Sequence, residues 1–290
     1  MDYLFHQNMR VFGGDAAARN QAYEVAFAQL RPTLGAASNV PIGGFTEIVN
    51  NTTATATMQM LAGRMGLTTV YLIACGKTAL AKGPEYVAVG ASAATPILAA
   101  GRIAIDASHN KITLIHDPAP ALPPPPGWCK TLPPGATLDY RGVVYLIANV
   151  GGTAIAVGFL HNMYTDPNTR TLIAEQIPHF GALMAAEPTM AGGPVYIGGD
   201  FNVLPIPRSL PAYGLYTPYA IGIPALPPPP HPIKPGGTTA AGNLYDYWYS
   251  DRAPAEPWPP GFVSPVAGVY TPTLFYPDMS DHCGVVLRIR

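Results

Sequence analysis

The chain has 290 residues, of which 48% are hydrophobic and only 11% are charged, against roughly 25% charged residues in typical soluble domains. Its 16 basic and 17 acidic residues give a net charge of −1, which excludes an overall field that would attract nucleic acid, so any polyanion must be held locally. No apolar stretch of about 18 residues is present, so no transmembrane helix is predicted. The 34 prolines and 30 glycines predict rigid turns and long loops.

The N-terminal residues MDYLFHQNMRVFGG predict a β-strand and lack the basic start, apolar centre and cleavage site of a secretory signal. We therefore expect a soluble protein, either a secreted, mature form or a domain of a larger exported protein, with its location left open. The three cysteines, Cys75, Cys129 and Cys283, lie far apart without C-x-x-C spacing. This pattern indicates neither a zinc site nor a disulfide framework.

Helical periodicity appears first at 16–30, where the expected buried stripe consists of Ala18, Ala22, Val25, Ala26, Ala28 and Leu30. Strand-like runs follow at 42–49, 68–75, 85–92, 102–108, 111–117, 141–150, 153–162, 194–203, 244–251 and 282–290. A second helix is predicted at 166–186. Because helices are few and interleaved with many strands, the sequence predicts an α+β fold: two packed mixed β-sheets flanked by helices, a four-layer α/β sandwich.

Two runs of four prolines, at 123–126 and 227–230, can continue neither a strand ladder nor a helix. They predict stiff segments on exposed loops, with a proline-recognising partner as the alternative. Sheet-like sequence resumes on both sides of each run. We therefore expect residues 1–290 to form a single domain.

The stretch GPVYIGGDFNVLP, at 193–205, places an aspartate and an asparagine directly after a short apolar strand. The strand is expected at 195–197, with Asp200 and Asn202 past its C-terminal end, where open α/β sheets collect ligands. In an extended segment these two side chains would point the same way. The preceding glycines are expected to let the backbone approach a ligand, although an ordinary turn is the alternative.

Other polar side chains also interrupt or end apolar runs. Glu47 lies inside FTEIV, His161 ends VAVGFLH, Asp246 lies in NLYDYWYS, and Asp281 and His282 precede the last strand. Burying such groups costs free energy unless they are paired or bound to a metal. Each alone could be a satisfied core group, but together they indicate a site.

These residues resemble the motifs of the endonuclease/exonuclease/phosphatase superfamily, which has the DNase I-like fold. The matching positions, in the order in which that superfamily has them, are Asn8, Glu47, Glu85, His161, Asp200, Asn202, Asp246 and Ser280 to His282. GDFN followed by a near-terminal SDH is the most specific part of the match. The chain departs from the usual pattern at Thr46, where the superfamily has glutamine, and at Tyr86, where it has glycine.

The resemblance implies a divalent-metal-dependent phosphodiester hydrolase. Glu47 would be the principal metal ligand, with Asp281 and Asn8 nearby, and oxygen ligands suit Mg²⁺, with Mn²⁺ or Ca²⁺ as alternatives. Asp200 and Asn202 would position or activate the attacking water.

The resemblance also implies two histidine–carboxylate pairs. His282 would contact the scissile phosphate with Asp246 fixing its tautomer, and Glu85 would orient His161 in the same way. His161 favours the DNase I, toxin-nuclease and sphingomyelinase branches. The other histidines, including His6, match no motif and are interpreted as structural or exposed.

DNA is the expected substrate of an endonuclease of this kind, with Arg10, Arg170 and Arg208 as binding residues. A sphingomyelinase or inositol-phosphate phosphatase is the first alternative, and the segment VSPVAGVYTPTLFYP could supply the apolar hairpin that membrane contact needs. The second alternative is a catalytically inactive binding module. If the chain is a toxin domain, an inhibitor or immunity protein would be a further partner.

Overall fold

The computed structural model describes residues 1–13, 17–34, 37–49, 52–77, 84–108, 111–119, 129–130, 140–163, 165–203, 214–216, 219–220, 239, 243, 245–252, 280, 282 and 284–290. The two proline runs, the segment at 263–277, Asp281, Arg208 and Cys283 lie outside these residues. Cys75 is a buried free thiol. None of the helices in the described part of the chain is long and apolar enough to cross a membrane.

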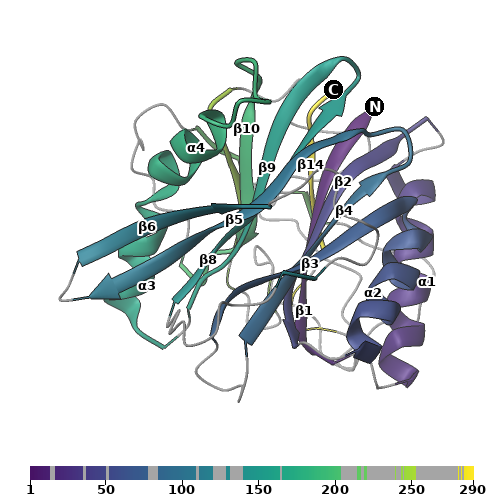
Figure 1. Cartoon of the computed structure of the whole chain (residues 1–290). Helices are drawn as coiled ribbons and strands as arrows, with labels where there is room; N and C mark the ends of the chain where they lie inside the picture. The colour runs from purple at the N-terminus through teal and green to yellow at the C-terminus, as the bar shows by residue number, and fades with distance from the viewer. Residues whose placement is uncertain are drawn as a thin grey trace.

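The first sheet joins the N-terminal third of the chain to its C-terminus. Its strand order is β12-β14-β1-β2-β4-β3-β7, and β1 pairs in parallel with β2. The bounds are β1 Asp2–Phe12, β2 Asn39–Val49, β3 Leu67–Lys77, β4 Pro84–Ser92, β7 Cys129–Lys130, β12 Tyr219–Ala220 and β14 Val285–Arg288. The two chain ends meet here, because the backbone N–H of Asp2 donates to the carbonyl of Arg290 over 3.0 Å (Figure 1).

The second sheet is built mainly from the middle of the chain. Its order is β11-β13-β10-β9-β8-β5-β6, and β9 and β10 are parallel neighbours. The bounds are β5 Ile97–Ser108, β6 Lys111–Pro118, β8 Tyr140–Val150, β9 Thr153–His161, β10 Val195–Asp200, β11 Gly214–Tyr216 and β13 Asp246–Ser250. Both sheets are mixed, as the sequence predicted.

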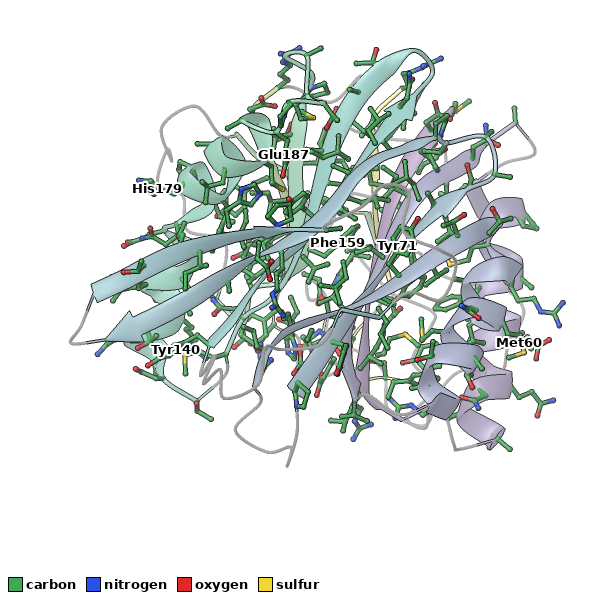
Figure 2. The ribbon with its side chains drawn as sticks, in the orientation of Figure 1. Met60, Tyr71, Tyr140, Phe159, His179 and Glu187 are labelled. Atoms are coloured by element: carbon green, nitrogen blue, oxygen red, sulfur yellow. The ribbon has the colours of Figure 1, made fainter. Side chains whose placement is uncertain are left out.

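Helices cover the outer face of each sheet, which gives four layers. The first sheet carries α1, Ala17–Leu34, and α2, Thr52–Arg64, and the second carries α3, Pro167–Ala174, and α4, Ile177–Ala185 (Figure 1). Three apolar cores separate the layers. Tyr71 and Phe159 lie in the middle core between the sheets, whereas Met60 points outward from α2 (Figure 2). The predicted four-layer α+β fold is therefore confirmed.

The helices differ from the sequence prediction in detail. The expected stripe of α1 is wrong at Ala18, Val25 and Ala28, which are exposed, because the larger rings of Tyr23 and Phe27 occupy the core. The single helix expected at 166–186 is two helices, since Pro178 has no N–H to continue α3 and starts α4. Helix α2 was not predicted from the sequence.

Candidate active site

Asp200 ends β10 and is the centre of the polar cluster. Its neighbours in the sheet are His161 at the end of β9 and Asp246 at the start of β13. The strand runs to Asp200 rather than stopping at Ile197 as predicted, because both neighbouring strands continue the ladder to that residue. Parallel strands that end together therefore place a carboxylate and an imidazole side by side.

The chain turns sharply after Asp200. Asn202 has a φ of +52°, so the extended geometry expected from the sequence is wrong, although the two side chains do meet. The backbone N–H of Asn202 donates to Asp200 Oδ1 over 2.9 Å, and its amide Nδ2 donates to Asp200 Oδ2 over 3.2 Å and to the carbonyl of Asn162 over 2.9 Å. Asn202 therefore fixes the orientation of the Asp200 carboxylate.

The two glycines before Asp200 serve packing. A Cβ atom on Gly198 would collide with the indole ring of Trp248, and one on Gly199 would collide with the carbonyl of Leu160. Gly199 also has a φ of +151°, which other residues rarely adopt. These glycines therefore allow close contact with the two neighbouring strands, and the approach of this backbone to a ligand stays a prediction.

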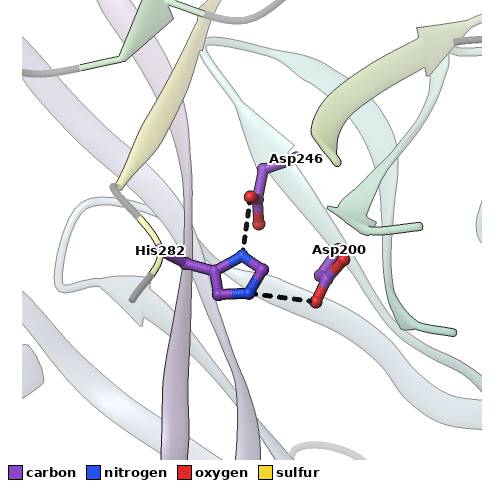
Figure 3. Close-up of side chains that lie close together, drawn as sticks. All are labelled: Asp200, Asp246 and His282. Carbon is purple, nitrogen blue, oxygen red and sulfur yellow. Dashed lines mark hydrogen bonds and ion pairs between the residues drawn. The ribbon is translucent and has the colours of Figure 1, made fainter. Parts of the chain in front are cut away.

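His282 approaches Asp200 from the C-terminal part of the chain. Its Nδ1 hydrogen-bonds to Asp246 Oδ2 over 2.8 Å, and its Nε2 lies 3.6 Å from Asp200 Oδ2 (Figure 3). The backbone of the same segment is held by Ser280, whose hydroxyl accepts from the His282 N–H over 3.1 Å and donates to the carbonyl of Asn8 over 2.8 Å. His282 is therefore fixed at its backbone by Ser280 and at its ring by Asp246.

His161 faces Asp200 from the opposite side. Its Nδ1 lies 2.5 Å from Glu85 Oε1, and its Nε2 lies 3.6 Å from Asp200 Oδ2. Arg141 joins this pair, with Nε 3.3 Å from Glu85 Oε2 and Nη1 2.7 Å from His161 Nε2. Burial, followed by the Arg141 charge, lowers the pKa of His161 to about 4, so the imidazole is held neutral.

The first sheet supplies Asn8 and Glu47. Asn8 Nδ2 donates to Asp200 Oδ2 over 3.0 Å and is fully buried. Glu47 sits at an irregularity in the pairing of β2 with β4 and has a φ of +61°. A bulge of this kind re-aims a side chain, and Glu47 Oε2 lies 3.9 Å from His161 Nε2.

The carboxyl groups of the cluster are buried close to one another, and Arg141 contacts Glu85. Burial, with smaller contributions from neighbouring carboxylates, raises the pKa of Glu47 and of Asp200. Burial also raises the pKa of Glu85 to about 7, even though Arg141 acts in the opposite direction. A group of buried carboxylates and amide oxygens fits a hard divalent cation, so the donor set agrees with the metal expected from the sequence resemblance.

Asp200, Asp246 and His282 also offer ligand atoms that lie within 4.8 Å of one another. Carboxylate oxygens and an imidazole nitrogen could together bind a metal ion. However, His282 Nδ1 and Asp246 are already joined by a 2.8 Å hydrogen bond, which an ion between them would have to replace. Among the candidate metal ligands that the structure describes, Glu47 is the most accessible, with a side chain that is 22% exposed.

Two of the expected substrate-binding arginines, Arg10 and Arg170, lie at the margin of the cluster. Arg10 is exposed, and its backbone N–H donates to Asn8 Oδ1 over 2.8 Å. Arg170, on α3, accepts from Asn162 Nδ2 through its carbonyl over 2.7 Å. Arg208 and the expected metal ligand Asp281 lie outside the described residues.

Sequence reasoning missed Arg141, Asn162 and the part that His6 plays. Arg141 begins the otherwise apolar run RGVVYLIANV, and an arginine at a strand end has no distinctive local signal. Asn162 directly follows His161 and is fully buried. His6 is also fully buried, and burial, with the neighbouring histidines, lowers its pKa well below the usual value.

No protein-family model matches the sequence, and no curated protein sequence matches it either. Solved structures do match. A mannosyl-6-phosphatase from Bacteroides thetaiotaomicron has a TM-score of 0.53 at 16% identity, covering 99% of this chain and 98% of its own. Sphingomyelinase C from Streptomyces griseocarneus has a TM-score of 0.51 at 17% identity, with 98% and 97% covered.

A Bacteroides thetaiotaomicron protein of the endonuclease/exonuclease/phosphatase family has a TM-score of 0.50 at 14% identity, covering 98% of this chain and 96% of its own. The chain therefore has the DNase I-like fold of that superfamily, as predicted. At these identities the likeness defines the fold. What the site does has to be argued from its own residues.

Proposed function

We propose that this chain is a divalent-metal-dependent phosphodiesterase, and specifically a DNase I-like endonuclease that cleaves DNA by attack of water on a phosphodiester. One observation carries the proposal: Asp200 Oδ2 lies 3.6 Å from the Nε2 atoms of both His161 and His282. Each imidazole is backed by its own buried carboxylate, Glu85 or Asp246. A base between two positioned imidazoles suits in-line displacement at phosphorus.

Each residue of the site has a separate role in the proposed reaction. Asp200, held by Asn8 and Asn202, takes the proton of the attacking water. His282, with Nδ1 bound to Asp246, points Nε2 toward the reacting group and gives a proton to the leaving oxygen. His161 is neutral, with Nδ1 facing Glu85, and Arg141 beside its Nε2 supplies the positive charge for phosphate oxygens.

Glu47 would hold the metal, together with Asn8 and Asp281. When bound, a divalent cation would neutralise charge on the phosphate. The raised pKa of Glu47 and the crowding of carboxylates around Asp200 support a cation at this position.

DNA is the proposed substrate because basic residues near the proposed metal site could anchor phosphates. Arg10 is exposed two residues from Asn8, Arg170 contacts Asn162, and Arg208 follows GDFN in the sequence. With so few basic side chains, the binding of DNA should be weak and should fall steeply as the salt concentration rises. A sphingomyelinase or inositol-phosphate phosphatase is the second candidate, since a sphingomyelinase and a sugar phosphatase share the fold.

The deciding experiment compares four substrates, namely supercoiled plasmid, RNA, sphingomyelin and inositol phosphates, each with Mg²⁺, Mn²⁺ or EDTA. Nicking of plasmid with a metal, in low salt, is expected. Turnover of lipid or inositol phosphate about a hundredfold faster than any nucleic acid would replace the nuclease by the second candidate. No turnover of any substrate would favour an inactive binding module, against which the retained buried charges argue.

A further inference from the structure

A third histidine, His6, lies beside the site but takes no part in the proposed chemistry. It is fully buried on β1, between Leu4 and Asn8 on the face that points toward the second sheet. Its ring stacks on Phe159, with 6.4 Å between centroids and 22° between planes. A Cβ atom on Gly44 would collide with Phe159, so the glycine allows the Phe159 ring to lie against β2.

The two ring nitrogens of His6 have different surroundings. Nε2 lies 3.1 Å from Thr46 Oγ1, within hydrogen-bond length. Nδ1 makes no hydrogen bond of ordinary length with the residues that the structure describes. The charged atom that it faces is Asp246 Oδ1, at 3.7 Å.

These surroundings select one tautomer. A neutral imidazole carries a single N–H, and a lone pair on Nδ1 would face the negative charge of Asp246. The hydroxyl of Thr46 can donate to Nε2, which leaves the proton on Nδ1. The N–H of His6 then points at the carboxylate.

We propose that His6 is a positioning residue of the active site, which holds the Asp246 carboxylate between two imidazoles so that His282 stays aimed at Asp200. Asp246 Oδ2 bonds to His282 Nδ1 over 2.8 Å, while Oδ1 faces His6. Rotation of the carboxylate away from His282 would break the hydrogen bond at Oδ2 and the contact of Oδ1 with the His6 ring. The inference concerns the site of the proposed phosphodiesterase and rests on that proposed function for its kinetic part.

The alternative explanation is that His6 only fills space between the sheets. An apolar residue would fill the same space without a buried polar ring that needs partners. The pairing of His6 with Thr46, one residue before Glu47, also couples the strand that carries Asn8 to the strand that carries the metal ligand. A residue that only filled space would not need the hydrogen bond to Thr46.

Two amide substitutions separate the roles of the ring nitrogens. In His6→Asn the amide nitrogen lies near the place of Nδ1, whereas in His6→Gln it lies near the place of Nε2. We expect His6→Gln to lower kcat about 10- to 100-fold on a chromogenic phosphodiester with Mg²⁺, the usual loss when a supporting residue is removed, with KM little changed. His6→Asn should recover most of that loss. The exposed His179 provides the control, and His179→Gln should match the parent protein.

A background substitution tests whether His6 acts through Asp246. In Asp246→Ala, adding His6→Gln should cause no further loss of kcat, because the contact is already gone. Equal kcat losses in both backgrounds, or equal activity of His6→Asn and His6→Gln, would overturn the proposal in favour of space filling.

A spectroscopic measurement decides the contact without any activity. Nitrogen-15 NMR of histidine-labelled parent protein reports the tautomer of each ring. We expect His6 to carry its proton on Nδ1, and its signal to shift in Asp246→Asn. A proton on Nε2 would overturn the proposal even if the variants do not fold. If the parent protein hydrolyses no phosphoester, the proposed function fails, while this spectrum still decides the His6–Asp246 contact.

Discussion

The substitution Asp200→Asn tests the centre of the proposed mechanism. Asp200 Oδ1 accepts from the Asn202 backbone N–H, and Oδ2 accepts from the side-chain amides of Asn8 and Asn202. An asparagine amide has one acceptor oxygen and one donor nitrogen, so no orientation satisfies all three donors. The change removes the proposed base and at least one hydrogen bond.

Two effects of different size follow. Loss of a positioned base costs typically 10²- to 10⁴-fold in kcat, which corresponds to about 3–5 kcal/mol in the barrier. Loss of a buried hydrogen bond costs about 1–3 kcal/mol of stability. Removal of the Asp200 charge offsets part of this cost, because burial of that carboxylate is unfavourable and raises its pKa. We therefore expect kcat to fall by at least 10²-fold while KM stays within about threefold and the fold persists.

Plasmid nicking and hydrolysis of a chromogenic phosphodiester, both with saturating Mg²⁺, measure kcat and KM. Asp251→Asn is the matched control, because Asp251 Oδ1 accepts from the backbone N–H of Val195 over 2.9 Å at the opposite end of β10. This control should keep the parent kcat. If Asp200→Asn keeps kcat within about threefold of the parent, Asp200 is not the base and the mechanism is wrong.

Three further predictions address the metal, the arginine and the packing. Mg²⁺ or Mn²⁺ at about 100 times its Kd should stabilise the protein by about 2.7 kcal/mol, and Glu47→Gln should remove most of this gain in a thermal melt. Arg141→Gln should raise the pKa of His161 above about 4 in an NMR titration, since loss of the adjacent cation favours the protonated ring. Gly198→Ala should lower the free energy of unfolding, measured by urea denaturation, by about 1–3 kcal/mol, because the added Cβ meets the ring of Trp248. In α2, a Cβ on Gly63 has no neighbour within 4 Å, so Gly63→Ala should leave the free energy of unfolding unchanged or raise it.

Each of these predictions has a contrary result. Equal metal-dependent stabilisation of Glu47→Gln and the parent protein would move the metal away from that carboxylate. An unchanged or lower pKa of His161 in Arg141→Gln would mean that burial alone sets it. If Gly198→Ala and Gly63→Ala are equally stable, the close approach of β10 to Trp248 does not constrain the sequence.

The strands and the principal acids could be predicted because their signals are local. GDFN, FTEIV and the SDH near the C-terminus each place a polar side chain beside an apolar run, which is costly without a purpose. Helix α2 was missed because its start, TTATAT, is rich in β-branched threonine, which lowers helix propensity. Its apolar stripe of Ala54, Met58 and Leu61 has helical spacing and packs on the first sheet, so the periodic signal was present but outweighed.

The supporting residues could not be found this way because their function depends on contacts between distant parts of the chain. Arg141 reaches Glu85 on the other sheet, and His6 faces Asp246, which is 240 residues later in the sequence. Nothing within a few residues of either one distinguishes it from an ordinary strand residue. Fully buried polar side chains that contact a predicted site residue are the structural signal that finds them, since a buried polar group without a role would be destabilising. On this basis Asn162, buried between Asn202 and Arg170, joins the same supporting layer: it fixes the turn after Asp200 through its carbonyl and α3 through its amide.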